Sequence, residues 1–240
     1  MPPLCIAHRG ASARAPENTL RAFACARALG ADGIELDVQT TRDGIPVVFH
    51  DEDLGRLTGR AGRLADCSRR ELRRLRVGGE PIPSLQEALA FARGRMIVQI
   101  EIKKGARLAP ILMAIRRTRT ARNVILASFE RPLLREAAAL APSIPRMLIA
   151  DPAPSPGDAA EAGMRWARAA ISLGACGISL NYRWIDSAPL VAAIRGRGLQ
   201  LWCWTVNDCR TMRRLSRWGV DGLVGNDPGK LRSVFPLTPR

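Results

Sequence analysis

Eight short apolar runs divide this 240-residue chain, and helix-like stretches separate most of them. Each run has the length and composition of a buried β-strand. The runs lie at 4–7, 33–38, 96–102, 123–127, 145–149, 176–180, 199–204 and 220–224. Strands that alternate with helices form parallel sheets, because each helix returns the chain to the start of the next strand. Eight such units favour a parallel eight-stranded (β/α)₈ barrel, a TIM barrel, over an open doubly wound sheet.

The stretches between the runs carry helix start and stop signals. ENTLRAFACARALG closes on Gly30, and NDCRTMRRLSRWG closes on Gly219, in the place where a glycine commonly terminates a helix. SLQEALAFARG begins with Ser84 and has Glu87 three residues later, the pattern of a capping box. We therefore expect helices in all three segments.

The second strand run is followed by an insertion. TRDGIPVVF, at 41–49, predicts a hairpin or strand extension that turns at Asp43-Gly44, and roughly 52–80 predicts a loop with a short helix. A chain of this length with 47% hydrophobic residues can bury a full core without disulfides or a metal. We expect one barrel domain over residues 1–240.

Several protein classes are excluded by the sequence. No run reaches the roughly 18 apolar residues that a membrane-spanning helix needs, and MPPLCIAHRG lacks the charged leader and cleavage site of a signal peptide. The six cysteines are widely spaced without a C-x-x-C pair, which predicts reduced, mostly buried thiols rather than a zinc or redox site. We expect a soluble cytoplasmic protein, and its oligomeric state is left open.

The net charge of +15 suits a polyanionic partner, but its source argues against nucleic acid. Only three of the 37 basic residues are lysines, so the excess is an arginine bias spread over the whole chain. The densest run, RRELRRLR at 69–76, has no aromatic side chains for base stacking and predicts a solvated helix face. We expect no nucleic acid partner; the charge is compatible with weak contact with anionic lipid and with steering of small anions.

Two acids share one face of the strand predicted at 33–38. Side chains alternate along a strand, so Ile34, Leu36 and Val38 lie on one face. Glu35 and Asp37 lie on the other. In a barrel the apolar face packs on the helices, and the opposite face points inward near the mouth, where barrel active sites lie.

The strand at 96–102 repeats this pattern, with Gln99, Glu101 and Lys103 opposite apolar residues. Buried carboxylates without a countercharge cost several kcal/mol each, so three converging acids favour a divalent cation. Oxygen ligands of this kind suit Mg²⁺ or Ca²⁺. Ordinary salt bridges with arginines are the alternative, although inward charge on two strands argues against it.

The chain has two histidines, and both end apolar runs. His8 is followed by Arg9, and His50 is followed by Asp51. Two histidines at strand ends, together with inward charge on two strands, are hard to explain by structure alone and favour a functional site at the mouth of the barrel. A hydrogen-bonded core histidine is the alternative for His8 alone.

Together these motifs resemble the glycerophosphodiester phosphodiesterase family, whose fold is a metal-dependent TIM barrel. The matching pieces are AHRGASARAPENT (7–19), ADGIELDVQTTRDGIPVVFHDEDLGRLT (31–58), IPSLQEAL (82–89), QIEIKK (99–104), ASF (127–129), WTVND (204–208) and GVDGLVGNDP (219–228). The resemblance covers both ends of the chain and most of its middle. One departure is Gly225-Asn226, where family members commonly carry Thr-Asp or Thr-Asn.

The resemblance implies roles for individual residues. His8 and His50 match the acid and base, without a decision between the two roles. Glu35, Asp37 and Glu101 match the ligands of a divalent metal, Mg²⁺ or Ca²⁺.

Further matches surround this centre. Glu17 matches a residue that helps to order the site or its metal. Arg9 and Lys103 match cations that hold phosphate oxygens, and Phe129 and Trp204 match apolar walls near the glycerol pocket.

The resemblance implies hydrolysis of a small-molecule glycerophosphodiester to sn-glycerol 3-phosphate and an alcohol. Choline, ethanolamine, glycerol and inositol esters and lysophospholipid head groups stay open as substrates, as do water and a glycerol hydroxyl as nucleophile. One alternative is a lyase-type or lysophospholipase D-like enzyme of the same barrel superfamily. Another, suggested only by the charge, is a non-catalytic binder of phosphodiesters or nucleic acid.

Overall fold

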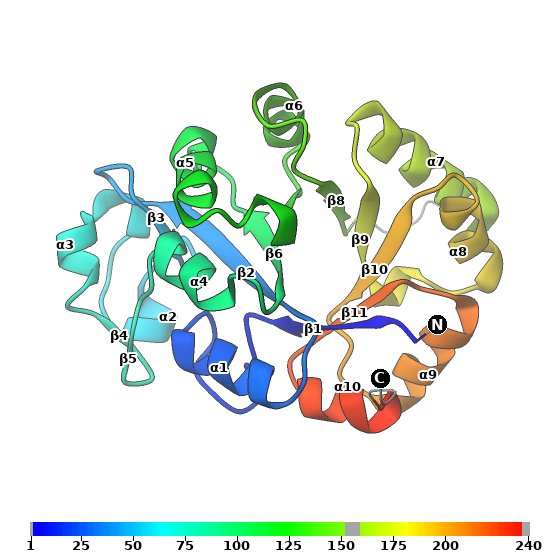
Figure 1. The fold of residues 1–240 in the computed structure, drawn as a ribbon, viewed down its shortest axis with the longest axis horizontal. Helices are drawn as coiled ribbons and strands as arrows, with labels where there is room; N and C mark the ends of the chain where they lie inside the picture. The colour runs from blue at the N-terminus through cyan, green and yellow to red at the C-terminus, as the bar shows by residue number, and fades with distance from the viewer. Residues whose placement is uncertain (1, 152–158, 237–240) are drawn as a thin grey trace.

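The computed structural model describes residues 2–151 and 159–236, and its centre is a closed barrel of parallel strands (Figure 1). In chain order the barrel strands are β1 (Leu4–His8), β2 (Gly33–Thr40), β6 (Ile97–Ile102), β7 (Val124–Ser128), β8 (Arg146–Ala150), β9 (Gly177–Asn181), β10 (Gln200–Trp204) and β11 (Gly222–Gly225). Consecutive members of this series pair in parallel, and β1 pairs with both β2 and β11, which closes the ring. The predicted TIM barrel is confirmed, with each predicted strand within two residues of an observed one.

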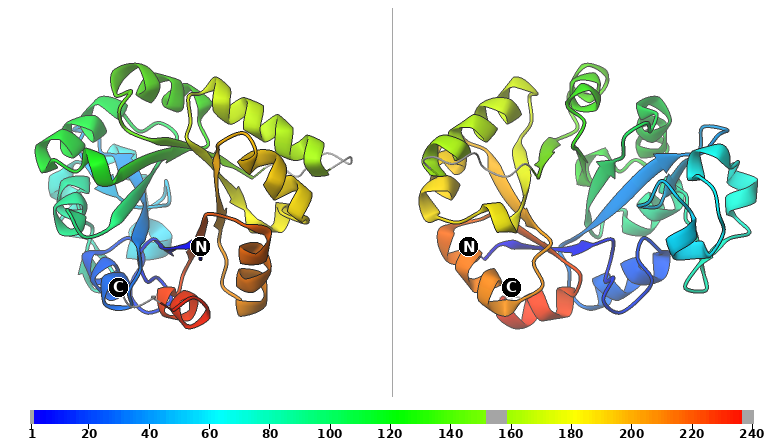
Figure 2. Two further views of the ribbon diagram at one scale, coloured as in Figure 1. Left: turned by 45° about the vertical axis from the view of Figure 1, so that its right-hand side comes forward. Right: turned by 180° about the vertical axis from the view of Figure 1, so that it is seen from behind.

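Helices form an outer layer around the strands (Figures 1 and 2). They are α1 (Leu20–Ala28), α4 (Leu85–Ala92), α5 (Leu108–Thr118), α6 (Arg131–Leu140), α7 (Ala159–Ser172), α8 (Ala188–Arg195), α9 (Cys209–Trp218) and α10 (Pro228–Val234), with single 3₁₀ turns at Ala121–Asn123 and Tyr182–Trp184. The predicted capping box is present: Ser84 accepts from the Glu87 amide, and the Glu87 carboxylate accepts from the Ser84 amide. Gly219 ends α9 in the left-handed conformation, with φ 88°.

The barrel interior has an apolar floor. Ile6, Met147 and Trp202 are fully buried and belong to one apolar cluster inside the ring. Because side chains alternate, the next inward position on β1 is His8 and the next on β10 is Trp204. This apolar floor therefore fills the interior on the side of the amino ends of the strands. Polar side chains occupy the next layer, at the carboxyl ends of the strands.

The insertion forms a lobe on one flank of the barrel (Figures 1 and 2). It contains α2 (Gly55–Thr58), a 3₁₀ turn (Leu64–Asp66), α3 (Arg69–Leu72) and the ribbon β4 (Arg76–Val77) and β5 (Glu80–Pro81). The hairpin predicted before it is present, since β3 (Pro46–Val48) pairs antiparallel with β2. Leu54, Leu64 and Leu72 are fully buried in an apolar cluster that belongs to this lobe.

Two expectations differ in part from the structure. Arg70, Arg73, Arg74 and Arg76 of the run at 69–76 are exposed, as expected for a solvated face, but the run is not one helix, because α3 is a single turn. Arg69 donates to the Ile82 carbonyl, and its side chain is only 16% exposed. Of the six unpaired cysteines, Cys5, Cys67 and Cys203 are buried, whereas the others are half-buried.

Among the helices that the structure describes, none is long and apolar enough to cross a membrane.

Candidate active site

Side chains from the first three barrel strands meet at one end of the barrel. Strand pairing places Glu35 beside His8, and Asp37 beside Glu101. Lys103 follows the last residue of β6. A pocket of about 230 Å³ opens here, lined by His8, Arg9, Glu35, His50, Gln99, Glu101, Lys103, Phe129, Ile149, Ser179, Trp204, Thr205 and Val224.

The three acids form a compact cluster at the wall of this pocket. One carboxylate oxygen each from Glu35, Asp37 and Glu101 lies within 4.8 Å of the others. Glu35 and Asp37 are buried, with 5% and 1% of their surface exposed. The Oε1 atom of Glu35 is buried and accepts no hydrogen bond from any residue that the structure describes. An unpaired carboxylate oxygen that faces two further carboxylates is suited to a cation.

The turn after β1 holds the acids in place. The Arg9 amide donates to Oε2 of Glu35 at 3.0 Å, and Nδ2 of Asn18 donates to Oδ2 of Asp37 at 2.8 Å. This turn requires glycine at position 10, which has φ +79° and where a Cβ would lie 2.7 Å from the Ala22 side chain. The His-Arg-Gly motif therefore supplies a tight turn whose backbone N–H binds Glu35, as well as charged side chains.

Burial and mutual repulsion make the acids unequal. Burial, together with the charges of Asp37 and Glu101, raises the pKa of Glu35 well above its ordinary value. Burial and Asp37 also raise the pKa of Glu101. Burial would raise the pKa of Asp37 as well, but Lys103 and Arg9 outweigh it and hold that pKa below its usual value.

Lys103 is the cation inside the cluster. Its Nζ lies 2.6 Å from Oε1 of Glu101 and 3.1 Å from Oδ1 of Asp37. Burial would lower the pKa of Lys103, but the two carboxylates outweigh it and raise that pKa. Lys103 therefore stays charged and offsets part of the acidic charge.

His8 is fixed by a residue from the other end of the chain. Its Nδ1 lies 2.8 Å from Oδ1 of Asn226, and its Nε2 lies 4.0 Å from Oε2 of Glu35. Burial, with the nearby charge of Arg9, lowers the pKa of His8 to about 4. The imidazole is therefore neutral at pH 7, and donation from Nδ1 to the amide oxygen leaves Nε2 free to accept a proton.

His50 has a carboxylate partner instead. Its Nδ1 donates to Oδ1 of Asp51 at 2.6 Å, and Asp51 is bound in turn by Arg56 from the insertion. The same guanidinium binds Glu17, whose Oε1 also accepts from Arg9 at 2.9 Å. The two histidines therefore have different hydrogen-bond partners, an amide for His8 and a carboxylate for His50.

Two aromatic side chains form the far wall of the pocket. The rings of Phe129 and Trp204 pack edge to face, with centroids 5.9 Å apart and planes at 85°. Nε1 of Trp204 donates to the Ser179 carbonyl at 3.1 Å, which fixes the indole. The ring of Phe129 is 43% exposed, so it lies at the entrance.

Nine of the ten residues predicted from the sequence line this pocket or its acid cluster. Glu17 is the tenth; it does not line the pocket, and it contacts Arg9 and Arg56 rather than the acid cluster. Asn18, Arg56 and Asn226 also contribute to the site and were not predicted from the sequence. All three lie within motifs that resemble the family, at 7–19, 31–58 and 219–228. Asn18 follows Glu17 and Asn226 comes shortly after the strand predicted at 220–224, so these positions were the available signals.

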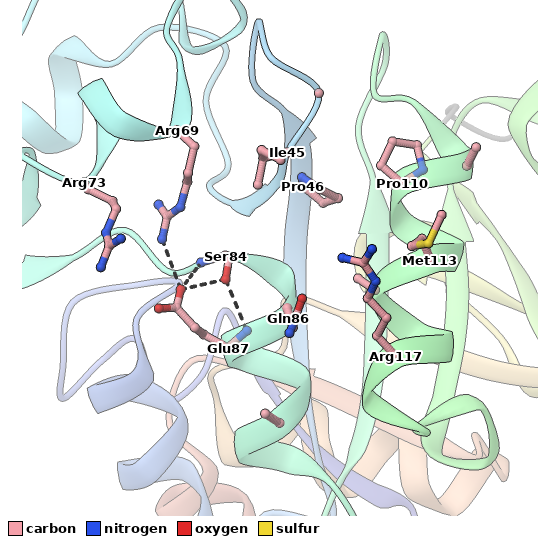
Figure 3. A pocket seen from close by; sticks show the side chains of 14 residues that line it. Ile45, Pro46, Arg69, Arg73, Ser84, Gln86, Glu87, Pro110, Met113 and Arg117 are labelled. Carbon is pink, nitrogen blue, oxygen red and sulfur yellow. Dashed lines mark hydrogen bonds and ion pairs between the residues drawn. The ribbon is translucent and has the colours of Figure 1, made fainter.

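A second, larger groove lies on the outside of the barrel (Figure 3). It has a volume of about 680 Å³ and runs between α4 and α5 beside the tip of the β2–β3 hairpin. Arg69, Arg73 and Arg117 are its cationic side chains, and Ile45 and Met113 are exposed on its walls. It contains neither histidine and none of the clustered acids, so its size does not mark it as the reaction centre.

Comparison with known proteins shows the family of this chain. Residues 8–230 match the glycerophosphoryl diester phosphodiesterase family. A glycerophosphodiester phosphodiesterase from Caldanaerobacter subterraneus subsp. tengcongensis is 36% identical over 248 residues, covering 96% of this chain and 97% of its own.

Solved structures of phosphodiesterases have the same fold as this chain. An Oleispira antarctica phosphodiesterase in complex with the product sn-glycerol-3-phosphate superposes with a TM-score of 0.86 at 27% identity, covering 98% of this chain and 97% of that one. The glycerophosphodiester phosphodiesterase of Thermotoga maritima gives a TM-score of 0.81 at 27% identity, covering 96% and 98%. The chain belongs to the glycerophosphoryl diester phosphodiesterase family, a family of phosphoric diester hydrolases.

Proposed function

We propose that this protein hydrolyses glycerophosphodiesters to sn-glycerol 3-phosphate and an alcohol, with a divalent cation and two histidines. The observation that carries the proposal is the convergence of three carboxylates, both histidines, Arg9 and Lys103 on one pocket at the carboxyl ends of the barrel strands. A pocket of about 230 Å³ is smaller than sites for drug-sized ligands and suits a compact group such as glycerol phosphate.

The donor set fits a hard cation. Three carboxylates within 4.8 Å of one another, one with a buried unpaired oxygen, offer the oxygen ligands that Mg²⁺ or Ca²⁺ prefers. Glu35, Asp37 and Glu101 would hold the ion. When bound, it supplies a positive charge that polarises a phosphoryl oxygen and lowers the pKa of a coordinated hydroxyl group.

The remaining groups bind the phosphodiester and move protons. Arg9 and Lys103 stabilise the charge that grows on the phosphoryl oxygens, as fixed cations in a partly buried site. His8 and His50 lie on the same pocket and serve as the acid and base, each with its Nδ1 held so that Nε2 is the exchanging atom. Phe129 and Trp204 provide an apolar wall for the glycerol carbons.

We further propose that residues 1–240 form a single phosphodiesterase barrel domain. All six cysteines are unpaired, which fits a reducing compartment, and we place the enzyme in the cytoplasm. The Oleispira enzyme binds sn-glycerol-3-phosphate, which supports the same product for this chain.

A product assay tests the proposal. The enzyme is incubated with glycerophosphocholine, glycerophosphoethanolamine and glycerophosphoinositol in Mg²⁺ or Ca²⁺, and sn-glycerol 3-phosphate is measured. We expect turnover that EDTA removes and that His8→Ala reduces by at least about 100-fold, because acid–base catalysis contributes about 10²–10⁴-fold. Hydrolysis that survives both treatments would reject this mechanism, and a cyclic phosphate as the end product would identify a lyase instead.

A further inference from the structure

Arg56 lies in α2, the first helix of the insertion, and its guanidinium binds two carboxylates at once. Nε and Nη2 both donate to Asp51, with Nη2 3.0 Å from Oδ1. Nη1 and Nη2 donate to Glu17 at 3.1 and 2.9 Å. All three nitrogens are engaged, in the paired geometry that fixes both the position and the plane of a carboxylate.

Each of the two carboxylates also binds a residue that lines the pocket. Asp51 accepts the Nδ1 proton of His50 at 2.6 Å. Glu17 accepts from Nη1 of Arg9 at 2.9 Å, and Nε of Arg9 lies 3.2 Å from Oδ2 of Asp37. An unbroken series of charged contacts therefore runs from one histidine to the acid cluster, and the guanidinium from the insertion is its middle member.

The backbone around Arg56 is anchored by apolar packing. Leu54, two residues earlier, is fully buried in the cluster of the insertion, and its carbonyl accepts from the Thr58 amide. The side chain of Arg56 is 49% exposed, whereas Glu17 and Asp51 are 18% and 21% exposed. A fixed backbone thus delivers a long side chain to two carboxylates that are mostly shielded from water.

From this geometry we infer that Arg56 is a positioning residue for the reaction proposed above, on which the inference rests. By joining Asp51 to Glu17, it fixes the ring of His50 and the guanidinium of Arg9 in one arrangement. A carboxylate at Nδ1 selects the tautomer of an imidazole, and the carboxylate must itself be held to do so. The insertion therefore contributes to proton transfer, in addition to covering one flank of the barrel.

Kinetics of three variants test this inference. We expect Arg56→Ala to lower kcat for glycerophosphocholine by about 10- to 100-fold, the usual effect of losing a partner that orients a histidine. KM should change less than kcat, because Arg56 does not line the pocket. Arg56→Lys should fall between Arg56→Ala and the parent, since an ammonium lacks the planar fork.

Arg63→Ala is the matched control. Arg63 lies in the same insertion and pairs with Glu52 at 3.2 Å, but both side chains are mostly exposed and neither contacts the site. This variant should keep the parental kcat. An Arg56→Ala enzyme within about twofold of the parent would overturn the inference, because a positioning contact of this kind is worth about tenfold or more.

A double-mutant cycle tests the route through Asp51. If Arg56 acts through that carboxylate, then Asp51→Asn combined with Arg56→Ala is about as slow as the slower single variant. Losses in kcat that multiply in the double variant would show that the two residues act independently, which also overturns the inference.

Nitrogen-15 NMR of the imidazoles gives a readout that needs no turnover. The chain has only His8 and His50, so two rings are observed. In the parent and in Arg63→Ala, we expect His50 to carry its proton on Nδ1. In folded Arg56→Ala, verified by circular dichroism, His50 should become a mixture of tautomers while His8 is unchanged.

An unaltered His50 spectrum in folded Arg56→Ala would reject the positioning role even in an active enzyme. The expected spectral change in a protein that cleaves no glycerophosphodiester would support the role of Arg56 and reject the proposed reaction. The two claims therefore fail separately.

Discussion

His8 and Asn226 lie 218 positions apart in the chain, and Nδ1 of the imidazole is 2.8 Å from Oδ1 of the amide. They meet because the first and last barrel strands pair, with Ala7 beside Gly225. The backbone N–H of Asn226 donates to Oδ1 of Asn207 at 2.9 Å, which holds the loop after β11 in place. One hydrogen bond across the closing seam of the barrel thus sets the orientation of a histidine that lines the pocket.

Asn226→Ala should lower kcat by at least about tenfold, because it removes the partner that fixes the imidazole. Steady-state kinetics with glycerophosphocholine measure this effect. Asn123→Ala is a suitable control, since Asn123 lies in the 3₁₀ turn before β7, outside the pocket. A parental kcat in Asn226→Ala would show that the closing seam does not position His8.

Glu35→Gln should remove the stabilisation that Mg²⁺ or Ca²⁺ gives the folded protein. A ligand at 100 times its Kd stabilises the native state by about 2.7 kcal/mol, which thermal unfolding detects. In EDTA the variant should be at least as stable as the parent, because it removes one of three clustered carboxylates that repel one another. Glu80→Gln, at an ion pair with Arg21 that belongs neither to the cluster nor to the pocket, should respond to the ion as the parent does.

An equal rise in Tm for Glu35→Gln and the parent would exclude Glu35 as a ligand. Loss of activity with a retained thermal shift would indicate that Glu35 acts on the substrate and does not hold the ion.

Asp51→Asn should destabilise the protein at neutral pH and much less at pH 2. Asp51 accepts hydrogen bonds from Arg56 and from His50. These bonds hold the pKa of Asp51 at about 2, below the ordinary value of 3.8. The stabilisation is therefore fully present above pH 3.8 and is lost as the pH falls through 2. It amounts to at most about 2 kcal/mol.

Urea unfolding between pH 2 and pH 7 measures the difference in unfolding free energy between Asp51→Asn and the parent. Asp66→Asn, at an exposed position of the same insertion, should show a small difference at every pH. A difference for Asp51→Asn that stays constant over this range would contradict the assigned pKa.

Phe129→Ala should raise KM by about 3- to 10-fold, the equivalent of one aromatic contact, with a smaller change in kcat. The ring is 43% exposed and packs on Trp204, so its removal leaves no large internal cavity and should change stability little. Leu140→Ala, which removes another exposed apolar side chain, 56% exposed at the end of α6, should leave KM unchanged. A parental KM in Phe129→Ala would remove this ring from the glycerol wall.

The barrel could be predicted from the sequence because its signals are local. Each strand is a short apolar run, and the period of two assigns Glu35 and Asp37 to the inward face without knowledge of tertiary structure. The caps of α4 and α9 depend on residues within one helical turn. Such patterns survive in the sequence because the residues that make them are neighbours in the chain.

The contacts of Arg56 and Asn226 have no local signal in the sequence. Asn226 contacts His8 only after the ring has closed, and Arg56 reaches Glu17 from a single helical turn that lacks periodicity. The same limit applies to Arg69, the one arginine of the run at 69–76 that is not exposed. Composition indicates solvent exposure, whereas the contacts of Arg69 with Ile82 and Glu87 depend on how the insertion folds back on the barrel.

The pairing of β1 with β11 also determines when the pocket can be completed during synthesis of the chain. The acids, both histidines and Lys103 have all left the ribosome well before the strand Gly222–Gly225 is made. Until that strand emerges, β1 has no second neighbour and His8 has no amide partner. A nascent polypeptide of this protein therefore carries these acids, histidines and lysine as an unassembled set until the last of the eight barrel strands has emerged, and the pocket can be completed only then.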